Sequence, residues 1–181
     1  MEPSSPRPWS LASRISFRFA ALFFCFFILP VDFLTEPIVI WVGENVFGME
    51  EVERYFSGSG DQSYSWTRLA LVAVAAMTGT AVWSRLDRKR NNYRAVFWYL
   101  SFLLRGYLGV MMIIYGIAKF GGQFQAPEMD TLTQEIGELS PMGLAWLFMG
   151  YSAAYSAFAG VLEIVGGILL AHRRTTLLGA L

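Results

Sequence analysis

The chain has 181 residues, of which 55% are hydrophobic and only 15% are charged, and its mean hydropathy is positive. A soluble domain carries about 45–50% apolar and about 25% charged residues, so this composition indicates a membrane protein. The formal net charge of zero gives no sign of a nucleic-acid partner, and one cysteine and one histidine are too few for a dithiol motif or a haem or metal site.

The apolar segments predict an all-α membrane protein, a four-transmembrane-helix bundle, because each span needs about 20 residues. The spans are expected at residues 15–35, 66–83, 95–120 and 142–171, after a proline-rich tail, 1–14, that is expected to be disordered. The arginines and apolar run before Pro30 also resemble a signal peptide. No small-x-small cleavage site follows, however, which favours an uncleaved first span.

Residues 36–65 are expected to form an outer loop with two features. The apolar stretch 38–47 is too short to span and is typical of an interfacial or re-entrant segment. Gly58, Gly60 and Asp61 lie in a glycine-rich loop that either cradles an anion or simply turns the chain. The connecting turn is favoured, since the loop lacks the lysine and the spacing of a phosphate loop.

The charged residues predict the topology. Basic residues gather in the tail, in the inner loop 84–94 and after the fourth span, whereas the outer loops 36–65 and 121–141 are mostly acidic. The positive-inside rule then places both termini in the cytoplasm. Residues 175–181 read as the start of another apolar helix, so the chain is expected to be truncated before a further span.

Arg105 and Glu163 are charges within the third and fourth spans. Arg105 is about 16 Å along a helix from Arg94, and Glu163 is about 15 Å from Arg173. If Arg94 and Arg173 mark the same membrane surface, Arg105 and Glu163 lie at nearly the same depth and form an intramembrane pair. Pairing offsets a cost of about 2.5–3.5 kcal/mol for a lone charge. The pair either lines a functional pocket or only fixes the helix register.

Small residues repeat at helical spacing around both charges, which predicts a close helix–helix interface. Tyr115 and Lys119 are one turn apart and can meet a headgroup or a quinone carbonyl together, although each is more often an ordinary interfacial residue. The pocket-lining candidates are Gly109, Tyr115, Lys119, Ser156 and Gly160.

Several motifs resemble those of the DoxX-like membrane family. They are Tyr115-Gly116-Ile117-Ala118-Lys119-Phe120 with Gln123-Phe124, Ser140-Pro141-Met142-Gly143-Leu144, Phe158-Ala159-Gly160 with Glu163, Gly166-Gly167, and Arg173-Arg174-Thr175. The loop Gly58-Ser59-Gly60-Asp61 and the run Trp83-Ser84-Arg85-Leu86-Asp87-Arg88 look similar to an uncharacterised bacterial branch of that family. The likeness covers roughly residues 41–181 and is most specific over 115–174.

The resemblance implies a multi-pass bundle in the bacterial cytoplasmic (inner) membrane. The family is named for a subunit of a thiosulfate:quinone oxidoreductase, so the implied role is that of an accessory subunit of a quinone-linked redox system. The implied ligand is a quinone, with no intrinsic cofactor, and the implied partners are the lipid bilayer and a redox subunit. Because function resides in sites rather than folds, two alternatives stay open: a small transporter or permease in which Glu163 binds a proton or cation, and a purely structural membrane partner. No catalytic residue is predicted.

Overall fold

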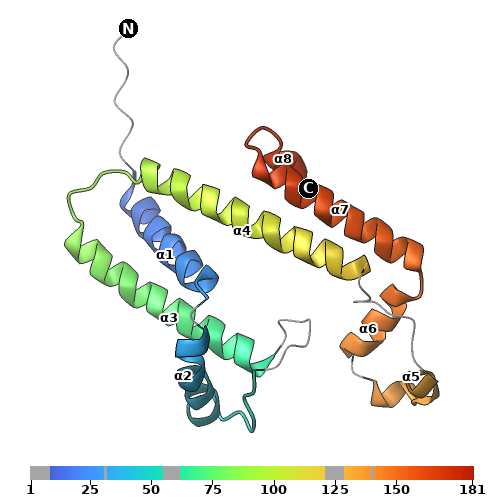
Figure 1. Cartoon of the computed structure of the whole chain (residues 1–181). Coiled ribbons are helices and arrows are strands. Elements are labelled where there is room, and N and C mark those ends of the chain that lie inside the picture. Colours follow the sequence, from blue (N-terminus) through green and yellow to red (C-terminus); the bar gives the residue numbers. More distant parts are fainter. Residues whose placement is uncertain (1–8, 31, 55–61, 121–128, 140) are drawn as a thin grey trace. The chain divides into compact units, whose positions relative to one another are not determined.

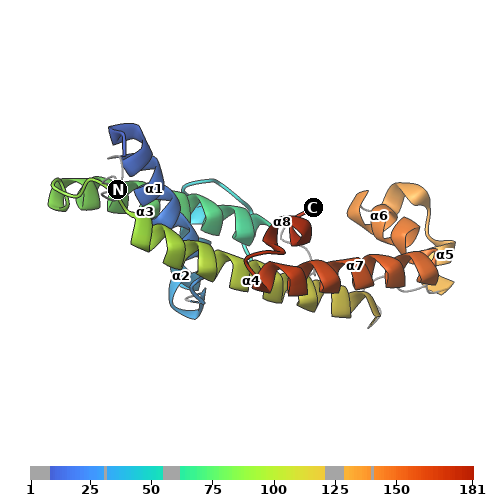
Figure 2. The ribbon, with the colours of Figure 1, turned by 90° about the horizontal axis from the view of Figure 1, so that it is seen from above.

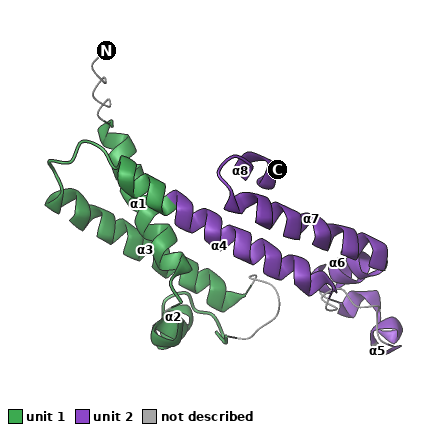
Figure 3. Ribbon diagram, turned by 45° about the horizontal axis from the view of Figure 1, so that its top comes forward, with its two compact units in different colours: residues 1–100 green, residues 101–181 purple. Residues whose placement is uncertain are grey.

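The computed structural model describes residues 9–30, 32–54, 62–120, 129–139 and 141–181, and these residues form helices and no strand. Four helices are long and apolar enough to cross a membrane (Figure 1): α1 (Leu11–Ile28), α3 (Ser63–Leu86), α4 (Arg94–Phe120) and α7 (Ala153–Ala171). The prediction of an all-α, multi-pass membrane protein is confirmed. The chain divides into two compact units, residues 1–100 and 101–181 (Figure 3).

The first helix, α1, starts and ends earlier than the predicted span 15–35. Ser10 caps its N-terminus, since the Ser10 side chain accepts a hydrogen bond from the backbone N–H of Ser13. Residues 11–14, predicted as part of a disordered tail, are therefore helical. The helix stops at Ile28 because Leu29 precedes Pro30, and a residue before proline is driven out of the helical region into extended backbone.

A separate helix, α2 (Asp32–Asn45), follows Pro30. It replaces both the end of the predicted first span and most of the short interfacial segment predicted at 38–47. Its buried residues are Val39 and Gly43. They pack on α3 and on the irregular segment that contains Val52. A Cβ atom on Gly43 would lie 2.7 Å from Cγ2 of Val52, so any larger residue would require the Val52 side chain to shift.

Helices α1 and α3 lie side by side in unit 1 (Figures 1 and 2). Gly79 of α3 receives the Leu22 side chain, which would lie 2.9 Å from a Cβ atom at that position. Near the other end of the pair, Phe17 and Ala21 of α1 form a buried cluster with Tyr93. Tyr93 comes from the predicted basic loop 84–94, so part of that loop is packed rather than free.

The predicted fourth span, 142–171, is two helices in unit 2. Helix α6 (Pro141–Gly150) ends at a glycine, and α7 begins after Ser152, whose side chain accepts a hydrogen bond from the backbone N–H of Tyr155. The hydroxyl of Ser156 donates to the carbonyl of Met149 across the break. A glycine at the end of α6 and a serine cap two residues later explain the interruption.

Unit 2 also contains three short elements. Within the predicted outer loop 121–141, the described part forms α5 (Met129–Thr133) and a 3₁₀ turn (Ile136–Glu138). After α7 the chain turns and forms α8 (Thr176–Gly179), which packs back on α7. A Cβ atom on Gly179 would lie 2.7 Å from the carbonyl oxygen of Gly166, so the segment predicted as the start of another helix lies in backbone contact with α7.

Candidate functional site

Glycines bring α4 and α7 into backbone contact in unit 2. A Cβ atom on Gly109 would lie 2.9 Å from the carbonyl oxygen of Gly167, and one on Gly116 would lie 2.7 Å from that of Gly160. Seven residues separate the two contacts on each helix, 109 to 116 and 160 to 167, so the helices run antiparallel in a defined register. The small-residue interface predicted from the sequence is confirmed at these positions.

An ion pair bridges this interface. Nζ of Lys119 lies 2.7 Å from Oε1 and 2.6 Å from Oε2 of Glu163. The Lys119 side chain is 11% exposed and that of Glu163 is 34% exposed, so the ammonium is enclosed while the carboxylate keeps an open side. Gly160 lies next to Lys119, since a Cβ atom on Gly160 would be 3.3 Å from Cβ of Lys119.

Side-chain direction explains why these two residues meet. Every Cα–Cβ bond in an α-helix is tilted toward the helix N-terminus. On antiparallel helices in the observed register, Lys119 therefore leans toward the level of Glu163 and Glu163 leans toward the level of Lys119. The two long side chains converge although their Cα atoms are several residues apart along the interface.

The predicted pairing of Arg105 with Glu163 is wrong. Arg105 instead donates from Nη1 to the hydroxyl of Thr176 in α8 over 3.1 Å, and that hydroxyl donates to the carbonyl of His172. The prediction needed Arg105 and Glu163 at one depth, but the observed register places Arg105 opposite Ala171, the last residue of α7, eight residues from Glu163. Arg105 also leans away from Glu163, toward its own helix N-terminus.

The other predicted pocket residues separate into different roles. Gly109 and Gly160 are points of backbone contact, and Ser156 is buried with its hydroxyl on Met149 across the α6–α7 break. Tyr115 is 48% exposed and does not join the ion pair. The loop candidates Gly58, Gly60 and Asp61 lie outside the described residues.

A buried cation in unit 1, Arg18, was not predicted as a site residue. Its Nε and Nη2 donate to the Tyr93 hydroxyl over 2.8 and 2.6 Å, Nη1 donates to Ser84 over 2.8 Å, and Nη2 also donates to the Asp87 carbonyl over 2.7 Å. Arg18 is only 3% exposed. No sequence pattern singled it out, because an arginine that flanks a span ordinarily extends its charged end to the membrane surface.

Asp87 completes this network from the loop that follows α3. The Tyr93 hydroxyl donates to Oδ2 of Asp87 over 2.8 Å, and the Trp83 indole N–H donates to the same oxygen over 3.4 Å. The hydrogen bond from Tyr93 holds the pKa of the Asp87 carboxyl below its usual range. Arg18, Tyr93 and Asp87 thus join α1 to the loop that follows α3.

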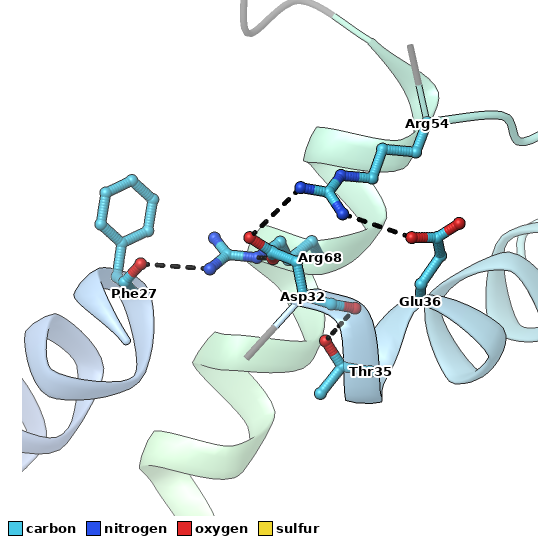
Figure 4. A network of polar contacts seen from close by, with 6 residues as sticks. All are labelled: Phe27, Asp32, Thr35, Glu36, Arg54 and Arg68. Carbon is cyan, nitrogen blue, oxygen red and sulfur yellow. Dashed lines mark hydrogen bonds and ion pairs between the residues drawn. The ribbon is translucent and has the colours of Figure 1, made fainter. Parts of the chain in front are cut away.

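A second network lies near the end of α1 and the start of α3, away from the Arg18 network. Figure 4 shows its side chains. Nε of Arg68 in α3 lies 2.5 Å from Oδ1 of Asp32, and its Nη2 donates to the Phe27 carbonyl at the open end of α1. Arg54 reaches two of the three carboxylates of α2, Glu36 at 3.3 Å and Asp32 at 3.8 Å. In the sequence, Asp32 and Arg68 lie at the ends of the predicted spans 15–35 and 66–83 that border the predicted outer loop, which was the available signal for this pairing.

The comparisons with known proteins assign no activity. No family model matches the chain, and no solved structure matches it. The chain is similar to a Bacillus subtilis (strain 168) protein described as "Uncharacterized protein YwoB", with 39% identity over 79 residues. That match covers 42% of this chain and 48% of the relative, so it spans about half of the relative's length. The DoxX-like resemblance stays a prediction.

Proposed function

We propose that this multi-pass protein is an accessory subunit of a quinone-linked redox system in the bacterial cytoplasmic membrane, with Lys119 and Glu163 as its ligand-contacting pair. The observation that carries the proposal is the ion pair itself, held between two apolar helices at a glycine crossing. Ionisable residues inside membrane segments are costly and mark functional sites by default. The DoxX-like sequence motifs, which include Lys119 and Glu163, support the same role.

The chemistry of Glu163 suits a quinol. A carboxylate offers about four lone-pair positions, and the described contacts from Lys119 use one on each oxygen. Because its side chain is 34% exposed, Glu163 can accept a hydrogen bond from a hydroxyl group that approaches from the lipid. The two contacts from Lys119 orient the carboxylate. When bound, the quinone would supply the two-electron chemistry, since two electrons from the partner subunit and two protons would convert it into the quinol whose hydroxyl group donates to Glu163.

Proton or cation transport is a second candidate function. It is favoured by the interruption between α6 and α7, because transporters often build their sites near broken helices. In this case Glu163 would take up a proton and break its ion pair with Lys119. The ion pair would form again when the proton leaves. This mechanism requires water to reach Glu163 from both membrane surfaces in turn.

The first experiment is native mass spectrometry of the full-length protein, gently solubilised from its own membrane, followed by extraction of bound lipids. We expect a retained quinone or a co-purifying subunit with a flavin or haem. Glu163→Gln should lose the quinone while Glu138→Gln, an exposed glutamate of the 3₁₀ turn, should keep it. A preparation that carries only phospholipid contradicts the redox proposal, and proton-coupled uptake into vesicles then tests transport.

A further inference from the structure

An apolar groove of about 290 Å³ adjoins the network of unit 1 that contains Asp32 and Arg68. Its volume is close to the lower end of the range for ligand pockets, about 300–1,000 Å³. Arg68, a member of the network, also lines the groove. The apolar lining comes from three helices: Phe26 of α1, Ile38 and Val39 of α2, and Leu71, Val72 and Ala75 of α3.

The depth of the groove in the membrane follows from α3. Arg68 is five residues after the start of α3, about 8 Å along the helix, and Ala75 is about 10 Å further on. The headgroup layers add about 5–8 Å on each side of a hydrocarbon core of about 30 Å. The charged network therefore lies where headgroups meet hydrocarbon, and the apolar walls lead from there into the hydrocarbon.

The charges beside the groove are of both signs. Two arginines, Arg54 and Arg68, face two carboxylates one helical turn apart, Asp32 and Glu36 (Figure 4). The more exposed members are Arg54, at 47%, and Glu36, at 38%, so one cation and one anion are accessible together. A purely anionic headgroup would meet the two arginines but would be repelled by the two carboxylates.

A buried hydroxyl next to the groove lacks a partner. Tyr64 is 4% exposed, and its hydroxyl makes no hydrogen bond in the described part of the chain. Tyr64 packs with Val39 and Leu71, both of which line the groove, and Arg54 lies over its ring. An unpaired buried hydroxyl is unfavourable, so an acceptor oxygen from a ligand would relieve it.

We propose that this groove binds one acyl chain of phosphatidylethanolamine, whose zwitterionic headgroup lies on the Arg54–Glu36 side of the network. The phosphate meets Arg54 and Arg68, since guanidinium groups bind phosphate oxygens through paired N–H donors. The primary ammonium donates to Glu36 and Asp32. A phosphate or ester oxygen accepts from Tyr64. This site is independent of the Lys119–Glu163 pair and does not rest on the proposed redox function.

The test uses the full chain in nanodiscs with equal amounts of phosphatidylethanolamine, phosphatidylcholine and phosphatidylglycerol that have identical acyl chains. Lipid retained after mild activation is measured by native mass spectrometry. We expect retained phosphatidylethanolamine to exceed each of the other lipids about tenfold, the ratio given by one charge-assisted hydrogen bond. Phosphatidylcholine cannot donate from its quaternary ammonium, and phosphatidylglycerol has no cation.

Two pairs of variants separate the headgroup from the chain. Glu36→Gln should abolish the preference for phosphatidylethanolamine, whereas Glu44→Gln, an exposed glutamate on the same helix outside the network, should keep it. Ala75→Phe should fill the groove and reduce retention of all three lipids, whereas Val74→Phe, on an exposed position outside the groove, should not. Equal retention of the three lipids by the wild type, a preference for phosphatidylglycerol, or no effect of Glu36→Gln would overturn the proposal.

Discussion

Gly116 and Gly160 bring the backbones of α4 and α7 so close that neither position has room for a side chain. A Cβ atom on Gly116 would lie 2.7 Å from the carbonyl oxygen of Gly160, and one on Gly160 would lie 2.8 Å from the carbonyl oxygen of Gly116. Because both obstructing atoms belong to helical backbone, they cannot move aside without shifting a whole helix. This crossing sets the register that brings Lys119 to Glu163.

Gly116→Ala should therefore destabilise unit 2 by about 1–3 kcal/mol, the usual cost of overpacking. Gly106→Ala on the same helix is the matched control, because a Cβ atom there has no neighbour within 4 Å. That control should be neutral or stabilising by up to about 1 kcal/mol, since alanine is the better helix former. Unfolding in mixed micelles measures both. Equal effects at the two positions would show that the α4–α7 contact is not formed in the protein.

A double-mutant cycle on Lys119 and Glu163 tests the ion pair. Lys119→Met and Glu163→Gln should each destabilise, and their effects should be non-additive, with a coupling energy of about 1–3 kcal/mol. Arg105→Met combined with Glu163→Gln should be additive to within about 0.5 kcal/mol, because Arg105 contacts Thr176 instead. The swap Lys119→Glu with Glu163→Lys distinguishes a structural role from quinone binding. In either case the protein should regain stability. If the pair binds a quinone, the bound quinone should still be lost.

The sequence predicted the fold better than it predicted the partners of its charges. Helix length and apolar composition are local properties, so the four spans were found. The small-residue faces around Gly109, Gly116, Gly160 and Gly167 were also found, because helical spacing is visible in a single segment. The choice between Lys119 and Arg105 as the partner of Glu163 depended on the register between two helices, which no local pattern encodes.

Local sequence patterns also failed to predict the helix interruptions and the buried polar networks. Pro30 was a visible stop signal, but its effect, a separate helix from Asp32, was underestimated. The interruption before Ser152 depends on a cap that competes with continuous helix, and both readings fit the local sequence. Arg18 and Tyr93 are 75 residues apart, so their contact arises only when α1 packs beside the end of α3.

Tyr93→Phe removes a single oxygen atom, but it should clearly lower the free energy of unfolding of unit 1. The Tyr93 hydroxyl accepts from two nitrogens of the buried Arg18 and donates to Asp87, so its loss leaves a buried cation under-coordinated. We expect a loss of about 1–3 kcal/mol in the free energy of unfolding. Tyr99→Phe, at a tyrosine that is 77% exposed, should change it by less than about 0.5 kcal/mol. Thermal unfolding with matched detergent compares the two, and a similar small change in both would contradict a stabilising role for the network.

The same network predicts how stability depends on pH. The Tyr93 hydroxyl lowers the pKa of Asp87 in the folded protein below the ordinary value of 3.8, so the folded state holds its carboxylate more firmly than the unfolded chain does. By linkage, this contribution is fully present above the unfolded pKa and is lost as the pH falls below it and through the folded pKa. The stability difference between the wild type and Asp87→Asn should therefore be constant from pH 7 down to about 5 and shrink on further acidification. In a Tyr93→Phe background the shrinkage should largely disappear, because the hydrogen bond that lowers the pKa is gone. Unfolding midpoints measured across this range decide the matter: a difference that grows as the pH falls would mean that Asp87 is stabilised in its protonated form.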